Sequence, residues 1–154
     1  MKDIYLRPAS LEDANVLLAW RNDTETRLAS HNQDIISLEQ HITWLEHSLA
    51  IPDKRQLWIA EIDGVAVGTC RADVVTDTTE NVWELSWTVA PEMRGKGIAY
   101  RMLRAFITSF ESSLMAQIKC ENIASIKVAD KLGFILKEEK EGVLFYSLPP
   151  FSKS

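Results

Sequence analysis

The chain has 154 residues, 46% of them hydrophobic and 25% charged, with a formal net charge of −5 at pH 7. This size fits one domain, residues 1–154, and the composition is that of an ordinary globular protein. The acidic balance argues against general nucleic-acid binding, and the absence of a long apolar run or a signal-peptide pattern leads us to expect a cytoplasmic protein without a membrane partner.

The first third of the chain predicts a strand followed by a helix and an irregular segment. We predict a strand over residues 4–7, ended by Pro8, and then a helix over residues 10–22. Ser10 starts this helix, with Asp13 at the spacing of a capping box. Residues 23–36 are polar without a clear period, so we expect them to be irregular.

A second helix is predicted to begin at Ser37, because serine is a good N-cap and the apolar residues that follow recur at helical spacing. The predicted apolar stripe of this helix is Leu38, Ile42, Leu45 and Leu49. His41 and Trp44 lie on its flank. Trp58 falls within an apolar strand run further along the chain, so we expect it in the core.

Strands dominate the rest of the chain. Residues 56–62 and 65–72 form two apolar runs joined by Asp63-Gly64, which predicts a β-hairpin. Residues 82–89 alternate apolar and polar side chains, which is the period of a half-buried strand. The remaining predicted elements are a strand at 114–120, a helix at 123–131, and strands at 135–140 and 143–148. This order indicates a mixed α/β fold.

Residues 94–99, Arg-Gly-Lys-Gly-Ile-Ala, lie between the strand at 82–89 and an amphipathic helix. Glycines allow close approach of the backbone, and the free N–H groups of a helix's first turn attract anions. The segment lacks the spacing of a Walker or Rossmann loop. Nearby basic side chains suit a ligand with several phosphates, although a solvated helix face is the alternative. These basic residues are Arg94, Lys96, Arg101 and Arg104, and the helix stripe expected to be buried is Ala99, Leu103, Phe106 and Phe110.

In this segment the chain resembles the GNAT superfamily of acyl-CoA N-acyltransferases. The family's loop reads Arg or Gln, two residues, Gly, one residue, then Gly or Ala, and Arg94, Gly97 and Ala99 match it. A second block, from Asn122 through Lys-Leu-Gly-Phe at residues 131–134, resembles the family's following helix. The resemblance covers about residues 4–148. It implies a six- or seven-stranded, mostly antiparallel sheet, splayed centrally between two parallel neighbours, with helices on both faces.

The resemblance also implies acetyl-CoA as co-substrate and no metal. The residues expected to bind acetyl-CoA are Val89, Arg94, Gly95, Lys96, Gly97, Ile98, Ala99 and Asn122. A plain helix N-cap is the competing interpretation of Asn122. Cys70 and Cys120 have no metal-ligand spacing and are expected to be buried or half-buried reduced thiols without a role.

For catalysis, the resemblance points to Glu84 as general base, on the strand face shared with Ser86 and Thr88. A solvent-facing strand glutamate is the alternative. Many relatives carry a tyrosine acid where this chain has Ala129. Ser125 is where some relatives carry a serine near the sulfur, but it could equally bond to its own backbone. A thiolate can also leave without a dedicated acid.

For the acceptor, Arg21 and His41 match by position an Arg and a His that bind nucleotide phosphates in the amino-sugar-nucleotide branch. Solvated or core-capping roles are equally open. We therefore predict transfer of an acetyl group to a primary amine of a small metabolite, with an amino sugar nucleotide as one candidate. A protein N-terminus of the ribosomal-protein type and a non-catalytic acyl-CoA-binding module are the alternatives. The oligomeric state is left open, with a homodimer as one option.

Overall fold

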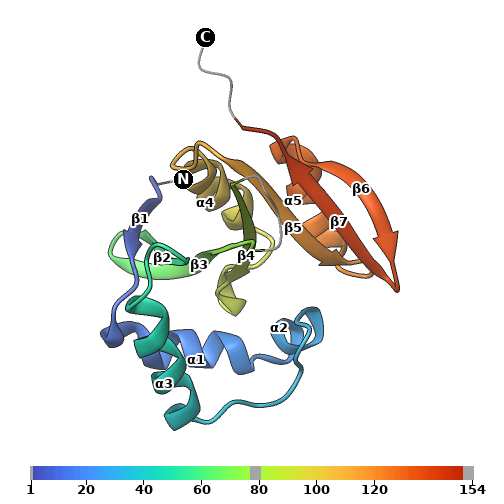
Figure 1. Ribbon diagram of the computed structural model, residues 1–154. Helices are drawn as coiled ribbons and strands as arrows, with labels where there is room; N and C mark the ends of the chain where they lie inside the picture. The colour runs from blue at the N-terminus through green and yellow to red at the C-terminus, as the bar shows by residue number, and fades with distance from the viewer. Residues whose placement is uncertain (1, 77–80, 151–154) are drawn as a thin grey trace.

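The computed structural model describes residues 2–76 and 81–150. Its strands are β1 (Tyr5–Pro8), β2 (Arg55–Ile62), β3 (Val65–Val74), β4 (Val82–Val89), β5 (Ser113–Lys119), β6 (Ile135–Lys140) and β7 (Val143–Leu148). Its helices are α1 (Ala14–Asn22), α2 (Thr24–Ala29), α3 (Leu38–Leu49), α4 (Ile98–Ile107) and α5 (Ile123–Leu132), with short 3₁₀ turns at Leu11–Asp13 and Pro91–Met93 (Figure 1).

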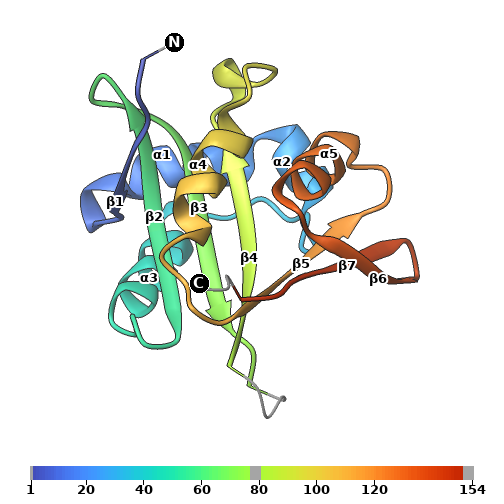
Figure 2. The same cartoon turned by 90° about the horizontal axis from the view of Figure 1, so that it is seen from above.

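The strands form one seven-stranded sheet in the order β1-β2-β3-β4-β5-β7-β6. Only β4 and β5 are parallel, and α4 makes the crossover between them. Their pairing runs from Val82 opposite Ser113 to Leu85 opposite Ala116 and goes no further. The two strands then diverge (Figure 2), so residues 86–89 of β4 face the opening. This confirms the predicted mixed sheet, its parallel pair and its central splay.

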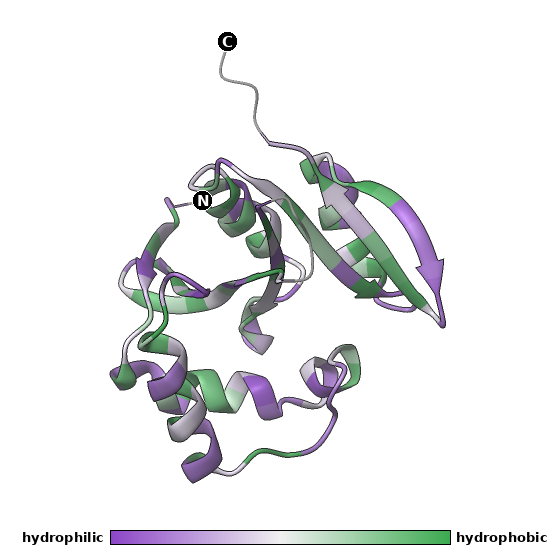
Figure 3. Ribbon diagram, viewed as in Figure 1, coloured by the Kyte–Doolittle hydropathy of each residue, from purple (hydrophilic) through white to green (hydrophobic). Residues whose placement is uncertain are grey.

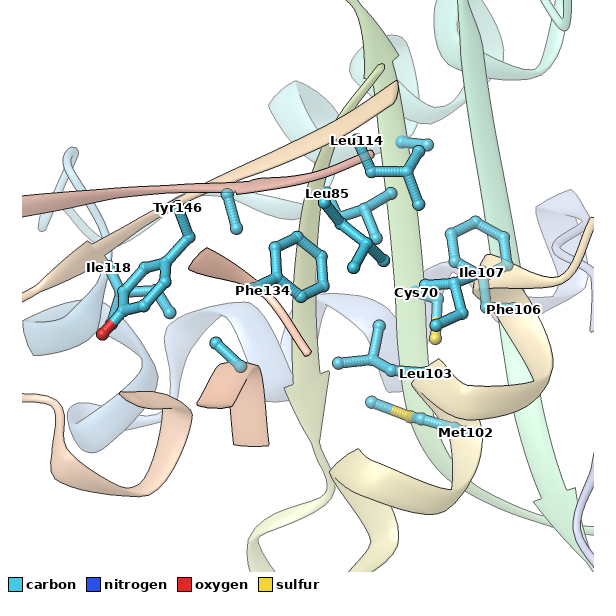
Figure 4. Close-up of a cluster of buried hydrophobic side chains, with 14 of the residues drawn as sticks. Cys70, Leu85, Met102, Leu103, Phe106, Ile107, Leu114, Ile118, Phe134 and Tyr146 are labelled. Carbon is cyan, nitrogen blue, oxygen red and sulfur yellow. The ribbon is translucent and has the colours of Figure 1, made fainter. Parts of the chain in front are cut away.

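Helix α4 covers one face of the sheet and supplies much of the larger core (Figure 4). Leu103 and Phe106 are buried as predicted, but Ala99 and Phe110 are only half-buried, whereas Ile98, Met102 and Ile107 are buried. The predicted stripe was too narrow, because α4 packs against both the sheet and α5. At Gly68 of β3 the helix approaches so closely that a Cβ atom would lie 2.7 Å from the Met102 sulfur.

The opposite face of β2 packs against α1 and α3 in a second core cluster. Leu57 and Ile59 point to this side, whereas Trp58 points to the α4 side and packs half-buried against the larger core, in agreement with its expected place. Helices therefore cover both faces, and their apolar sides turn toward the sheet (Figure 3). The edge strand β6 is exposed along its length.

Helix α2 is a correction to the sequence analysis, which expected residues 23–36 to be irregular. It has six residues, none of them buried, so it lacks the apolar period that predicts a helix. Asp23 caps its N-terminus by accepting the Thr26 N–H. Pro8 is a smaller correction. We predicted that the strand ends before Pro8, but Pro8 is the last residue of β1 and pairs with Trp58. The edge position of β1 tolerates a proline.

The two cysteines are free, with Cys70 buried and Cys120 exposed. Burial raises the pKa of the Cys70 thiol. The exposure of Cys120 contradicts the expectation for that residue, because it lies just beyond the end of β5, outside the paired strand. Over residues 2–76 and 81–150, no helix is both long and apolar enough to span a membrane.

Candidate functional site

The loop before α4 has the geometry of an anion cradle. Gly95 and Gly97 have φ of 78° and 74°, a backbone conformation that favours glycine. Gly97 is the N-cap of α4, and the first hydrogen bond of the helix runs from the Arg101 N–H to the Gly97 carbonyl. The N–H groups of residues 98–100 are therefore without partners inside the helix. No atom lies within 4 Å of a Cβ built on Gly95 or Gly97, so a phosphate oxygen can reach this backbone.

The side chain of Arg94 is engaged by helix α2 and its N-cap. Its guanidinium is hydrogen-bonded to Asp23 Oδ2 and to Thr26 Oγ1, the latter at 3.3 Å, and it lies 3.1 Å from Glu25 Oε2. The hydrogen bond from Arg94 holds the pKa of Asp23 below its usual range. Arg101 similarly donates to the carbonyl of Lys2. The backbone N–H groups of the loop and the exposed side chain of Lys96 are thus the groups here that these contacts leave available to an anion.

Glu84 lies on β4 on the face opposite α4, since its neighbours Trp83 and Leu85 pack into the larger core. Its Oε1 accepts a hydrogen bond of 3.2 Å from Gln117 Nε2 of β5. Burial raises the pKa of Glu84 above its ordinary value, and the charge of Asp73 raises it further. A half-buried carboxylate with a raised pKa has the properties of a general base.

Arg21 and His41 come together on that same side of the sheet, at the end of α1 and in α3. Arg21 Nη2 donates to the Asn32 carbonyl at 2.6 Å. Arg21 Nη1 and His41 Nε2 are buried, and neither has a hydrogen-bond partner among the described residues. Burial and then the charge of Arg21 lower the pKa of His41, which is 5% exposed and stacks on Trp44. Buried polar atoms without a hydrogen-bond partner are rare in folded proteins, and they occur where water, an ion or a ligand can bind.

Three further expected residues lie around the opening between β4 and β5. Asn122 Oδ1 accepts the Ser125 N–H at 3.3 Å, which makes Asn122 the N-cap of α5. Ser125 is half-buried, and its hydroxyl makes no hydrogen bond within the described residues. Val89 ends β4 in its section beyond the β5 pairing. Ala129, where relatives carry a tyrosine, is fully buried in the larger core.

Four polar residues on the same face of the sheet as Glu84 were not predicted from the sequence. They are Arg55 of β2, Arg71 and Asp73 of β3, and Gln117 of β5. Two charged residues at positions i and i+2 of an otherwise apolar strand were a usable signal in β3, because such a pair shares one face. Across the described part of the chain, no group of three or more His, Cys, Asp or Glu side chains is arranged to hold a metal ion.

Comparison with known proteins gives one matching family and a group of solved structures of similar fold. The family described as "Acetyltransferase (GNAT) domain" matches residues 3–135. The ribosomal-protein-alanine N-acetyltransferase from Brucella melitensis is 29% identical, with 94% of this chain and 99% of that chain covered and a TM-score of 0.79. No curated protein is similar enough in sequence to count as a match.

Two other solved structures share the fold at lower identity. A putative acetyltransferase from Salmonella typhimurium with its cofactor acetyl-CoA is 21% identical, with 96% and 94% of the two chains covered and a TM-score of 0.77. A phosphinothricin acetyltransferase from Sinorhizobium meliloti in complex with acetyl-CoA is 22% identical, with 96% and 88% covered and a TM-score of 0.79. The family match spans most of the chain and includes the loop at residues 94–99, and so the protein belongs to the GNAT acetyltransferase family.

Proposed function

We propose that this acetyltransferase transfers the acetyl group of acetyl-CoA directly to a primary amine of a small metabolite, with an amino sugar nucleotide as the leading candidate. The observation that carries the acceptor assignment is the pair of unsatisfied buried atoms, Arg21 Nη1 and His41 Nε2. They lie on the side of the sheet where Glu84 is found. A cationic guanidinium beside an imidazole is suited to an anionic group such as a phosphate.

The backbone of residues 94–99 is the proposed holder of the co-substrate's pyrophosphate, because its N–H groups and open glycines fit a phosphate oxygen. Asn122 and Val89 would lie along the arm that carries the acetyl group, next to the section of β4 that β5 leaves unpaired. Strand edges of this kind offer N–H and C=O groups to an extended ligand. Two solved structures of similar fold contain acetyl-CoA, which supports acetyl-CoA as the co-substrate.

Glu84 is the proposed base. The amine nitrogen forms a bond to the acetyl carbonyl carbon, the carbon–sulfur bond breaks, the amine proton goes to Glu84, and the sulfur leaves as a thiolate. A thiol with a pKa of about 8.5 can leave in this form, so the buried Ala129 in place of a tyrosine does not prevent turnover. Ser125 is the proposed hydrogen-bond donor to the sulfur.

We further propose that residues 1–154 form one domain and that the protein acts in the cytoplasm.

A protein N-terminus is the second candidate acceptor, since the relative from Brucella melitensis is named as a ribosomal-protein-alanine N-acetyltransferase. The two candidates differ in what meets Arg21 and His41. A phosphate-bearing sugar supplies an anion at that place, whereas an alanyl peptide supplies neutral backbone carbonyls. A non-catalytic acyl-CoA-binding module is a third candidate, supported by the missing tyrosine.

The test is a panel of acceptors incubated with isotope-labelled acetyl-CoA and read by mass spectrometry. The panel pairs amino sugars with and without phosphate groups, and adds peptides with free N-terminal alanine. We expect the phosphorylated sugars to be acetylated and Arg21→Gln to abolish their advantage over the unphosphorylated ones. Acetylation of peptides alone would reject the metabolite assignment. Thermal stabilisation by coenzyme A without thiol release from any amine would favour the non-catalytic module.

A further inference from the structure

A row of polar side chains crosses the sheet on the face that carries Glu84. Arg55 of β2 is directly opposite Asp73 of β3, and Asp73 is directly opposite Glu84 of β4. On the far side, Gln117 of β5 reaches Glu84. Residues that face each other across a sheet point to the same side, so the row is continuous over four strands. Its two ends, Arg55 and Gln117, are 62 residues apart in the sequence.

Both carboxylate oxygens of Asp73 are hydrogen-bonded to arginine side chains in this row. Arg55 Nε donates to its Oδ1 at 2.5 Å, and Arg71 Nε donates to its Oδ2 at 2.7 Å. The two guanidinium groups lie over the Trp44 ring, 5.4 and 5.2 Å from its centroid. Arg55 Nη1 also donates to the Ser48 hydroxyl of α3 at 2.9 Å. These contacts restrain the Asp73 carboxylate beside its neighbour on β4.

Glu84 has an unequal pair of carboxylate oxygens. Oε1 accepts the hydrogen bond from Gln117, and Oε2 has no hydrogen-bond partner among the described residues. Burial and the negative charge of Asp73 raise the pKa of Glu84, while the Gln117 hydrogen bond and the charges of His31 and Arg71 lower it. The groups that surround Glu84 from β3, β5 and the segment after α2 thus act in opposite directions.

We propose that Asp73 and Gln117 are positioning residues for the acetyl transfer: Asp73 keeps the Glu84 carboxylate basic, and Gln117 fixes Oε1 so that Oε2 receives the amine proton. This inference rests on the proposed role of Glu84 as base. The physical reason is that a like charge nearby disfavours ionisation of a carboxyl group, which makes its ionised form a stronger base. A hydrogen bond to one oxygen restricts rotation of the carboxylate and orients the other oxygen.

The first experiment compares the wild type with Asp73→Asn and Gln117→Leu by recording kcat/KM against pH, with glucosamine 6-phosphate as the acceptor probe. Asp73→Asn removes the like charge, so the acidic limb should move to lower pH by about one pH unit, with a lower plateau. Gln117→Leu removes a donor to the ionised form, so the limb should move to higher pH. Glu61→Gln, which removes a carboxylate paired with Arg7 far along β2, is the control and should leave the limb in place.

The second experiment follows the carbon resonance of the Glu84 carboxylate by NMR during a pH titration of the same variants, and it needs no acceptor. Opposite shifts of its pKa in Asp73→Asn and Gln117→Leu support the inference. An unchanged Glu84 titration in both folded variants overturns it. If the NMR titration shifts but the kinetic limb does not move, the row still tunes Glu84 and the role of Glu84 as base is rejected. Asp73→Glu keeps the negative charge, so its acidic limb of kcat/KM should stay at the wild-type pH. If this limb and the Glu84 titration both shift in Asp73→Glu, the charge of Asp73 is not what tunes Glu84.

Discussion

Glu84 combines a raised pKa with a place on the side of the sheet where Arg21 and His41 lie. Its base form is the ionised carboxylate, so activity should fall as the pH drops through this raised value. We predict that Glu84→Gln binds acetyl-CoA normally but lowers kcat/KM by about 10²–10⁴ and loses the acidic limb of the pH–rate profile. Calorimetry gives the affinity and kinetics give the profile.

The stability of the Glu84→Gln variant separates catalysis from folding. A carboxyl group whose pKa is raised in the folded state favours its neutral form there, so the ionised group costs stability above that pKa. The neutral glutamine should therefore leave the free energy of unfolding at pH 7 unchanged or slightly higher. A wild-type acidic limb in this variant would eliminate Glu84 as the base.

Gly97 offers a second prediction, with a matched control in the chain. Gly64 and Gly97 have φ of 76° and 74°, and neither has an atom within 4 Å of a built Cβ. Valine at either position should therefore cost a similar strain, about 1–3 kcal/mol. Only Gly97→Val should also weaken acetyl-CoA binding, because its side chain would occupy the anion cradle. Equal affinities of the two variants in calorimetry would place the co-substrate elsewhere.

Helix α2 connects the two sides of the splay. Arg94, which follows β4, donates a hydrogen bond to Asp23, the N-cap of α2. Lys119, at the end of β5, donates to the carbonyls of Leu28 and Ser30 at 2.9 and 2.8 Å. Since no residue of α2 is buried, these charge-assisted hydrogen bonds rather than apolar packing hold the helix in place.

We predict that α2 opens locally when either attachment is removed. Asp23→Asn keeps an N-cap of equal quality but loses the ion pair, and Lys119→Met removes the donor at the other end. Amide hydrogen exchange over residues 24–30 should accelerate at least about tenfold, because tenfold is about 1.4 kcal/mol, roughly the contribution of one charge-assisted hydrogen bond, while exchange in β3 stays slow. Lys127→Met, on the exposed side of α5, is the control. Unaltered exchange in α2 would mean that other contacts hold it.

At the scale of the whole molecule, one buried carboxylate links the start of the chain to the sheet. Arg7 of β1 donates to both oxygens of Asp13 at 2.7 and 2.8 Å and to Glu61 of β2 at 3.0 Å. Asp13 also accepts the Ser10 N–H at 2.8 Å, as the capping box predicted, and its side chain is 8% exposed. The Arg7 hydrogen bonds hold the pKa of Asp13 below its ordinary value.

This pKa predicts how stability depends on pH. A lowered folded-state pKa contributes stability above the unfolded value, and the contribution is lost as the pH falls through the folded value. Asp13→Asn should therefore lower the free energy of unfolding at about pH 7 by roughly 1–2 kcal/mol, because Arg7 is partly exposed and solvent screens the pair. The difference should disappear once the pH lies below the lowered folded-state pKa of Asp13. Urea unfolding in both pH ranges tests this, and an equal deficit in both would assign the effect to packing.

Local features of the sequence were sufficient for the family and for most elements. The Asp63-Gly64 hairpin, the alternation at residues 82–89, and the loop at 94–99 followed by a helix all depend on residues close together in the chain. Their physics is short-range: turn conformations, side-chain periods of two and 3.6, and helix caps. For the same reason the candidate residues Glu84, Arg21 and His41 could be named in advance, while their roles stay predictions.

The tertiary structure alone decided which distant residues meet. Helix α2 has no apolar period, so its sequence did not predict it. Its ion pair with Arg94 and its hydrogen bonds from Lys119 come from distant parts of the chain. Asp73 and Gln117 reach Glu84 only because β3 and β5 lie on either side of β4, and the strand order depends on the packing of the whole sheet. Arg21 and His41 similarly become a pair when α1 packs on α3. Such contacts depend on non-local burial of apolar surface, which no local pattern of residues records.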